Sequence, residues 1–578
     1  MTFTEHARRR SEPISRLTHP GLFHAAFKWK DVPVRHPVSN LTALPAGPNA
    51  AIPKVQYDFA PETHELRVER QQRLAAVKEA FLHSWEGYKQ NAWLQDEVAP
   101  LTGEYKNGFG GWGATLVDSL DSLVIMGLDT EFKAALEGLR KVHFTTADLD
   151  KLNVFETTIR YLGGLLSAYD LSGQIHGILL ERAIDLGEML YVAFDTPNRM
   201  PITRWDWRNG ALGGDQLADR HALLAEVGSL SLEFTRLSQL TGDSKWYDAI
   251  ARITDVFEEQ QNRTKIPGLW PVYLDVQNKN FRVDITFTLG GMADSVYEYL
   301  PKQHLMLGGQ SDQYRSMYHT ALESAKQNIF FRPLNPSNTS MLIPGTVKRH
   351  SARNKALIPQ GQHLTCFAGG MVALAAKIFN EPKELQTARE LVDGCLWAYD
   401  SMNSGIGPEI FTAMTCQPDS SDDNDNCTWS DDRWYAAVAR HANGGGDSRT
   451  SPTAQAQKVI AANRLAPGFL AINDARYILR PEAIESLFVL YRITGDKSLQ
   501  DRAWQMFQAI NSATKTSIAY ASVNDVTLEE PELFNSMESF WTAETLKYFY
   551  LIFSEPDVVS LDKYVLNTEA HPLLRPVD

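Results

Sequence analysis

The chain has 578 residues, 43% of them hydrophobic, so it is long and apolar enough to bury a large core. It carries 56 basic and 70 acidic residues and a net charge of −14. No long basic run occurs, which argues against a nucleic-acid partner. No run of about 18 apolar residues occurs either, so neither a transmembrane helix nor a signal-peptide core is predicted.

Two interpretations of that pattern stay open. Either the protein is soluble by design, or the chain begins downstream of a signal or membrane anchor. We favour the second, because other features indicate the secretory pathway. Four Cys are too few for a disulfide framework but permit two bridges in an oxidising compartment. Acceptor sequons for N-glycosylation occur at Asn40, Asn262, Asn338 and Asn426.

In chain order, residues 1–60 come first and are rich in Pro and basic side chains, which predicts an irregular N-terminal arm. Residues 61–578 are expected to form a single domain. Residues 64–93 carry apolar side chains at helical spacing, and most of the remaining chain alternates helical stretches with Gly, Pro, Asn and Asp breaks. Strand-like alternation is local, as at residues 518–526. The predicted class is all-α, with minor β-hairpins in loops.

A loose internal repeat refines this prediction. Four segments, which begin at Gly163, Leu230, Gly370 and Ile484, share an apolar helix, a turn and the start of a second helix. Such αα-hairpins stack either into an open solenoid or into a closed toroid. Periodicity does not choose between the two. The irregular intervals between the copies, with long loops between them, favour a toroid whose loops are elaborated on one face.

Acidic residues lie inside several of these apolar helical segments, where an unpaired charge is costly. Glu156 and Arg160 are four residues apart, as are Asp294 and Glu298. Glu482 and Glu485 are three apart, after Arg480 and a Pro481 expected at the first helical position, and Glu538 and Glu544 lie among aromatic residues. For any single pair, a solvated or ion-paired face is the simpler interpretation. Several pairs beside aromatic residues are instead typical of a glycosidase, which needs an acid, a base and ring faces for sugar.

At six places the chain resembles the α-1,2-mannosidases of glycoside hydrolase family 47. These are Gly111-WGATLVDSLDSLVIMGL, Val154-FETTIRYLGGLLSAYDLSG, Ala293-DSVYEYLPKQ, Leu479-RPEAIESLFVLYRITGD, Met537-ESFWTAETLKY and Leu566-NTEAHPL. They recur in order over nearly the whole chain beyond the arm. The resemblance implies an (α/α)7 barrel with the active site at the bottom of a funnel, which agrees with the toroid.

The resemblance also implies roles for individual residues. Glu156 matches the general acid, which would protonate the glycosidic oxygen through a water. Glu482 matches the carboxylate usually assigned as general base, and Asp294 the third essential carboxylate. The division of labour between Glu482 and Asp294 stays open. Thr568 matches the direct protein ligand of a Ca²⁺ ion, with waters held by acidic residues completing the coordination.

Further positions match residues that line the glycan pocket, contact sugar or hold those waters. They are Arg160, Glu226, Glu298, His363, Glu409, Arg480, Glu485, Phe540, Glu544 and Glu569, with Phe540 expected beneath the terminal mannose. Cys366 and Cys395 match the family's disulfide, which leaves Cys416 to pair with Cys427.

Met292 bears on branch preference. The endoplasmic-reticulum type of the family usually has Arg at this position, whereas the Golgi type has an apolar residue. An apolar side chain does not hold one glycan branch through charged hydrogen bonds, so the pocket should accept several branches. We therefore expect Golgi-like trimming of Man9 toward Man5. Asn535 and Ser536 also depart from the family, which often has Asp and a basic residue there.

The expected protein is thus a Ca²⁺-dependent inverting enzyme acting on high-mannose N-glycans of glycoproteins in the lumen of the Golgi or endoplasmic reticulum, or outside the cell. It is expected to be a monomer, with any membrane attachment through an anchor outside this sequence. Two alternatives remain: a quality-control lectin on the same fold that binds mannose with little turnover, and another α/α-barrel carbohydrate enzyme. Intact Glu156, Asp294, Glu482 and Thr568 argue against the lectin, and the ordered motifs against the other enzyme.

Overall fold

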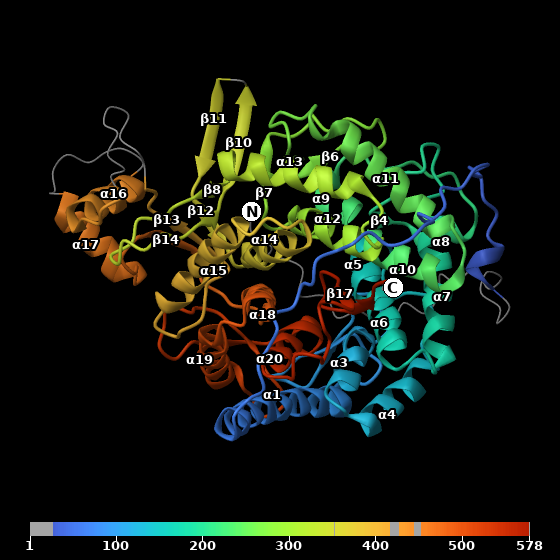
Figure 1. Cartoon of the computed structure of the whole chain (residues 1–578), viewed down its shortest axis with the longest axis horizontal. Coiled ribbons are helices and arrows are strands. Elements are labelled where there is room, and N and C mark those ends of the chain that lie inside the picture. The colour runs from blue at the N-terminus through green and yellow to red at the C-terminus, as the bar shows by residue number, and fades with distance from the viewer. Residues whose placement is uncertain (1–26, 352, 417–426, 444–451, 577–578) are drawn as a thin grey trace.

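The protein is a closed ring of helices arranged in two layers, seen in a computed structural model that describes residues 27–351, 353–416, 427–443 and 452–576 (Figure 1). The inner layer consists of helices that are almost wholly buried. They are α3 (Leu120–Ile125), α6 (Gly163–Leu171), α10 (Ser231–Thr241), α12 (Asp294–Met306), α14 (Phe367–Ile378), α18 (Glu482–Thr494) and α20 (Leu546–Ile552). Consecutive members of this series pack side by side, and α20 returns to α3 through the π-helical segment η4 (Trp541–Thr545).

The outer layer covers the inner one with amphipathic helices, each burying one face. Its members are α1 (His64–Asn91), α4 (Asp129–Leu139), α7 (Gly177–Val192), α11 (Lys245–Gln261), α13 (Asp312–Asn328), α15 (Glu384–Asp400) and α19 (Lys497–Thr514). Each inner helix except α20 is followed at once by its outer partner. Helix α20 packs instead against α1, so the two ends of the chain close the ring.

Short turns join each inner helix to its outer partner on one face of the ring. Gly242 and Gly495 end α10 and α18 in the left-handed region, at φ 73° and 71°, a conformation that glycine adopts without strain. Longer connections lead from each outer helix to the next inner helix on the opposite face. We call this second face the mouth of the barrel.

Short antiparallel strands organise those connections. They pair as β1 (Glu97–Val98) with β2 (Tyr105–Lys106), β3 (Leu152–Asn153) with β4 (Arg204–Trp205), β5 (Ala222–Leu223) with β6 (Tyr273–Leu274), β8 (Phe330–Phe331) with β9 (Ile343–Pro344), β15 (Ser522–Val523) with β16 (Leu533–Phe534), and β17 (Tyr564–Leu566) with β18 (Pro572–Leu574). The two three-stranded sheets are β11 (Asn354–Ile358), β10 (Thr346–Ser351), β7 (Thr286–Thr288), and β12 (Gln360–Gln362), β13 (Ile410–Ala413), β14 (Phe469–Asp474).

The remaining helical segments are short or lie outside the ring. They are η1 (Trp29–Asp31), α2 (Ala114–Asp118), α5 (Val154–Glu156), the π-helical η2 (Thr157–Leu162), α8 (Trp207–Ala211), α9 (Leu224–Gly228), η3 (His363–Cys366), α16 (Asp431–Asn443) and α17 (Pro452–Asn463). Helices α16 and α17 pack on each other around a small core of their own that includes Trp434 and Val438, and project to one side of the ring (Figure 1).

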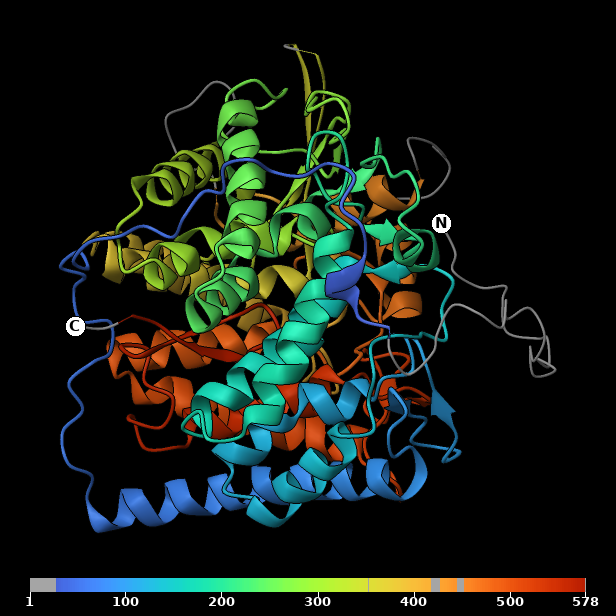
Figure 2. The ribbon, with the colours of Figure 1, turned by 90° about the vertical axis from the view of Figure 1, so that its right-hand side faces the viewer.

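Residues 27–63 run along the outside of the ring, and the only helix or strand in this stretch is η1 (Figure 2). Trp29 is buried there and donates its indole N–H to the Phe144 carbonyl at 2.7 Å. Farther along, the Tyr57 amide donates to the Arg492 carbonyl at 2.8 Å. Within the described residues, no helix combines the length and apolar character needed to cross a bilayer.

Local predictions hold where apolar periodicity is strong. The helix predicted over residues 64–93 is α1, and the four repeat segments form α6, α10, α14 and α18, each followed by its outer helix. The strand-like stretch at residues 518–526 forms only the two-residue β15, because β15 pairs with an equally short β16. Pro481 is the N-cap of α18 rather than its first residue, since the helix begins at Glu482.

Candidate functional site

Charged side chains gather where the inner helices begin at the mouth. Asp294 and Glu482 are the first residues of α12 and α18. Glu156 ends α5, which continues through η2 into α6, and Glu226 lies in α9, just before α10. Side chains separated by more than 300 residues in sequence thereby converge on the interior of the ring at its mouth, the region that we call the cavity.

Arg160 contacts several of the charged side chains on one side of the cavity. Its guanidinium is buried and donates to Glu156 at 2.9 Å, to the Ser539 hydroxyl at 3.0 Å, and to Glu569. Asp118 lies 3.5 Å away and is fully buried. The predicted ion pair between Glu156 and Arg160 is thus present, and Arg160 also ties the C-terminal hairpin to that wall.

Glu482 lies on the other side and is held by a histidine. His363 Nδ1 lies 2.7 Å from a Glu482 oxygen, and His363 Nε2 lies 2.7 Å from the Tyr399 hydroxyl. Burial alone would raise the pKa of Glu482, but the His363 hydrogen bond and the nearby Arg480 guanidinium bring it below the ordinary value. Glu482 is therefore stabilised as a carboxylate.

The remaining contacts of Arg480 lie beside this group. Its guanidinium donates to Glu409 at 2.5 Å and approaches Glu482 at 3.7 Å. The Glu409 backbone carbonyl accepts from the His363 amide at 2.9 Å. The segments before α14 and α18 are thus joined around the Glu482 carboxylate.

Asp294 differs from Glu482 in its surroundings. Burial and the charges of Glu298 and Glu482 raise the pKa of Asp294 to about 7, although the Ser295 amide and Arg480 oppose the shift. One helical turn deeper, Glu298 pairs with the buried Lys302. Two neighbouring carboxyl groups thus have pKa values shifted in opposite directions, lowered for Glu482 and raised for Asp294.

The base of the cavity holds more carboxylates than its cations neutralise. Burial and the charge of Glu298 raise the pKa of Glu485 to about 8, although Lys302 lies 3.6 Å away. Burial, with the charges of Glu569, Glu482 and Glu485, raises the pKa of Glu544 well above its ordinary value. Burial likewise raises the pKa of Glu569, which Arg160 opposes.

The C-terminal hairpin β17–β18 carries Thr568 into this region. The Thr568 amide donates to the Tyr299 hydroxyl at 3.3 Å, and Asn567 Nδ2 donates to Glu233 at 2.7 Å. His571 is fully buried between Asp118, at 3.0 Å, and Asp121, at 2.7 Å. Thr568 itself is half-buried, at the tip of the hairpin.

Three other predicted residues lie toward the mouth. Glu226 is buried and accepts from Asn153 at 3.2 Å and from Arg204. Phe540 directly precedes η4, and its ring lies 5.7 Å from the Arg160 guanidinium. Met292 is 52% exposed. Contacts and charges link most of the other predicted residues to one another, whereas Met292 is exposed.

The backbone is irregular next to several of these residues. Glu156 and Phe540 directly precede the π-helical η2 and η4, and such π-helical turns occur often at functional sites. Met292, Leu479 and Ala570, each within two residues of a predicted site residue, adopt φ of 75°, 70° and 57°. Left-handed φ in residues with a side chain costs free energy and clusters at active sites.

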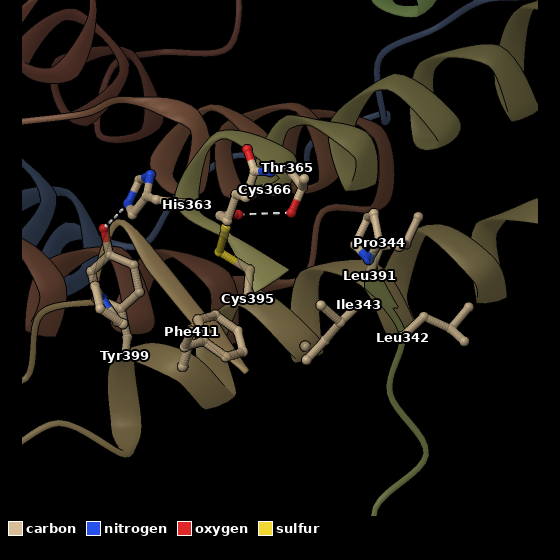
Figure 3. Close-up of a pocket in the computed structure, with 15 residues that line it drawn as sticks. Leu342, Ile343, Pro344, His363, Thr365, Cys366, Leu391, Cys395, Tyr399 and Phe411 are labelled. Atoms are coloured by element: carbon tan, nitrogen blue, oxygen red, sulfur yellow. Dashed lines mark hydrogen bonds between the residues drawn. A yellow bond between two sulfur atoms is a disulfide. The ribbon is translucent and has the colours of Figure 1, made fainter. Parts of the chain in front are cut away.

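Both predicted disulfides form. Cys366 is bonded to Cys395, with Cα atoms 5.6 Å apart, and Cys416 to Cys427, with Cα atoms 5.0 Å apart. Cys366 ends η3, three residues after His363, and the first bridge lines a small cavity behind that histidine, together with Tyr399 and Phe411 (Figure 3). This bridge therefore braces the segment that positions His363. The sequon at Asn426 lies outside the described residues.

A sequence profile of glycosyl hydrolase family 47 matches residues 80–575. The chain belongs to this family. Human endoplasmic reticulum mannosyl-oligosaccharide 1,2-alpha-mannosidase is 35% identical over 505 residues, which cover 87% of this chain and 64% of the human protein, so the chain spans less than two thirds of that relative. Mannosyl-oligosaccharide 1,2-alpha-mannosidase MNS1 of Arabidopsis thaliana is also 35% identical, over 87% of this chain and 78% of its own.

A solved structure confirms the fold. The alpha-1,2-mannosidase from Trichoderma reesei superposes with a TM-score of 0.75 at 31% identity, over 88% of this chain and 99% of that one. The predicted (α/α)7 barrel with small antiparallel sheets is therefore confirmed.

Sequence reasoning did not single out several polar residues that contact the predicted site. Tyr399 and Glu97 lie in none of the quoted motifs, and Lys302 lies inside the motif that begins at Ala293, although each is a polar residue that is fully or nearly buried. Asp118 lies inside the quoted motif that begins at Gly111, and an acid within that apolar helix was the signal available. Among the described residues, no three His, Cys, Asp or Glu side chains form a metal-binding cluster.

Proposed function

We propose that the protein is an inverting α-1,2-mannosidase that removes terminal mannose from high-mannose N-glycans of glycoproteins. Family membership and the activities named for the human and Arabidopsis relatives support the reaction and the substrate. One observation carries the proposal furthest: Glu156 and Glu482 begin two different parts of the inner layer, and each carboxyl group is held by a different partner, Arg160 at 2.9 Å and His363 at 2.7 Å. A glycosidase needs two carboxyl groups placed in this way.

Glu156 is the proposed general acid. It would protonate the leaving glycosidic oxygen, through a water, from the side on which Arg160 fixes its carboxyl group at 2.9 Å. Phe540 offers a ring face beside it for the terminal mannose. Arg160 in turn contacts Glu569 and so links the acid to the hairpin that carries Thr568.

Glu482 is the proposed general base. His363 and Arg480 keep its pKa low, so it is ionised and able to accept a proton from the attacking water. Asp294, with a pKa of about 7, would support that water and the sugar from the start of α12. Burial is the main cause of the raised pKa of Asp294. At acidic pH this carboxyl group is therefore already protonated and, unlike Glu482, is not free to accept a proton from water.

We propose that a Ca²⁺ ion binds at the tip of the β17–β18 hairpin, where Thr568 would hold it through its hydroxyl and carbonyl oxygens. Oxygen donors suit this hard cation, and waters bound by carboxylates would complete its coordination. Glu298, Glu485, Glu544 and Glu569 are the proposed holders of those waters. Their excess negative charge supports the proposal, because the charges of Glu569 and Glu485 help to raise the pKa of Glu544, and the charge of Glu298 helps to raise the pKa of Glu485. When bound, the ion would supply a positive charge and would coordinate oxygen atoms.

The exposed, uncharged Met292 supports a broad branch preference, with Man9 trimmed toward Man5. Glu226, Glu409 and Arg480 would contact the branches near the mouth. The two disulfides and the relatives' names support a site of action in the lumen of the secretory pathway or outside the cell.

Trimming of free Man9 in the presence and absence of a chelator tests the proposal. We expect mannose release, β-mannose as the first product by NMR, and loss of release on calcium removal that returns with added calcium. Glu156→Gln should lower kcat by at least about 100-fold and leave glycan binding largely intact, because only proton transfer is removed. Wild-type binding of Man9 without turnover would instead indicate a lectin, and unchanged turnover by Glu156→Gln would refute the role of Glu156.

A further inference from the structure

One strongly basic element projects from an otherwise acidic protein. Strands β10 and β11, together with Arg353 between them, contain Lys348, Arg349, His350, Arg353 and Lys355 and no Asp or Glu, whereas the whole chain has a net charge of −14. We call this element the basic hairpin. Figures 1 and 2 show its two strands extending beyond the helices of the barrel.

The basic hairpin lies at the mouth, between two parts of the proposed active site. Its β10 pairs with β7 through Thr346 and Thr288, and the chain reaches Asp294 six residues after Thr288. Its β11 ends at Ile358, and β12 leads directly from there to His363. The tip is therefore anchored through short covalent paths to both sides of the cavity.

The positive charges of the basic hairpin do not stabilise the fold through ion pairs. Lys348, His350, Arg353 and Lys355 are exposed, and within the part of the chain that the structure describes no ion pair joins a cation of the hairpin to a carboxylate. Lys355 donates only to the neutral Asn328 side chain, at 3.1 Å. Arg349 pairs directly across the strands with Lys355, a like-charge arrangement that destabilises a hairpin.

The nearest acid along the adjoining strand does not neutralise this charge either. Asp284 precedes Ile285, whose carbonyl accepts from the Arg349 amide at 2.8 Å. The Asp284 oxygens accept backbone N–H groups instead, from Tyr273 at 3.3 Å and from Ile285 at 2.7 Å. The cations of the hairpin are thus available to a partner.

We propose that the basic hairpin binds acidic segments of the polypeptide that carries the N-glycan, and so selects among glycoprotein substrates. This inference rests on the proposed function. A glycan whose terminal mannose enters the cavity leaves through the mouth, so its polypeptide faces the rim. High-mannose glycans carry no charge, and the acidic cavity repels anions. Beyond Lys348, the last residue paired with β7, β10 extends about 10 Å farther from the sheet, toward the polypeptide.

The test compares one glycoprotein carrying a Man9 glycan in two forms, with Asp/Glu or with Asn/Gln at residues flanking the glycosylated Asn. We expect kcat/KM to be about 3- to 10-fold higher for the acidic form at low salt, with the difference lost near 0.5 M NaCl, as rim charges act mainly on association. Lys348→Glu/Arg353→Glu should abolish or reverse the preference and leave free Man9 turnover within about 2-fold.

Lys133→Glu/Lys383→Glu is the matched control. Lys133 lies in α4 and Lys383 precedes α15, both exposed and outside the loops of the mouth, and the change in net charge is the same. This control should keep the preference. Binding of both glycoproteins to the immobilised protein gives a second readout that does not depend on turnover.

The outcomes separate the two proposals. Wild-type protein that fails to trim free Man9 refutes the proposed function, while the binding preference still tests the hairpin. Equal kcat/KM and equal binding for the two glycoprotein forms overturn the inference about the hairpin, as does a preference that survives in Lys348→Glu/Arg353→Glu. Hairpin-dependent binding to phosphatidylserine vesicles without discrimination between the glycoproteins would assign the surface to a membrane and also overturn it.

Discussion

His363 determines the protonation state of the proposed base. Its Nδ1 faces Glu482 at 2.7 Å, and its other ring nitrogen faces the Tyr399 hydroxyl, so the ring is fixed from both sides. We predict that His363→Asn shifts the acidic limb of the kcat/KM profile to higher pH. Burial raises the pKa of Glu482 and the His363 hydrogen bond lowers it, so without His363 the base is protonated at a higher pH. Activity measured from pH 4 to 8 on Man9 checks this shift.

Tyr399→Phe supplies the companion measurement. It keeps the His363 contact with Glu482 but removes the hydroxyl that orients the ring, so kcat should fall by about 3- to 10-fold while the acidic limb moves little. Coincident pH profiles for His363→Asn and the wild-type protein would show that His363 does not control the base.

At the scale of elements, the β17–β18 hairpin depends on a buried charge network. Asp121 contacts His571 at 2.7 Å and Lys547 at 2.9 Å, and all three side chains are fully buried. We predict that Asp121→Asn lowers the free energy of unfolding by about 3–5 kcal/mol, because Lys547 is left as an uncompensated buried charge. Denaturant unfolding checks the value.

Glu259→Gln is the control, since its pair with Arg263 is more than half exposed and should be worth less than about 1 kcal/mol. Equal losses in the two variants would contradict the argument.

The sequence predicted those elements that local patterns specify. Apolar periodicity located α1 and four of the inner helices, and helical spacing correctly paired Glu156 with Arg160. Only the resemblance predicts that Glu482 and Thr568 belong to one site, because apolar periodicity says nothing about contacts between distant segments. Lys302 was overlooked although it lies four residues after Glu298 on the same helix, a spacing that the sequence itself shows. Tyr399 was not foreseen, because its contact with His363 joins two elements that are remote in sequence. The π-helical η2 and η4 were missed for the same reason, since tertiary packing and not local propensity sets them.

At the scale of the whole molecule, closing the ring concentrates buried carboxyl groups whose pKa values are raised, to about 7 for Asp294 and about 8 for Glu485. A raised carboxyl pKa means that the folded protein binds protons which the unfolded chain has released, so stability falls as pH rises from about 4.5 to 8. His571 adds to this trend, because burial opposes but Asp121 and Asp118 raise its pKa, and that contribution is lost as pH rises above about 6.5.

We therefore predict that calcium-free protein unfolds at a lower temperature at pH 8 than at pH 6, by roughly 2–5 °C, and that added calcium stabilises it more at pH 8. A divalent cation offsets the repulsion only when the carboxylates are ionised, so its benefit should grow with pH. Thermal unfolding with chelator and with calcium, at both pH values, measures the four transitions. Thr568→Ala, which removes one proposed ligand oxygen at the hairpin tip, should keep the pH dependence of the calcium-free protein and lose much of the calcium-induced gain. If the calcium-induced rise in unfolding temperature does not depend on pH, or is as large in Thr568→Ala as in the wild-type protein, the cation binds away from the base of the barrel.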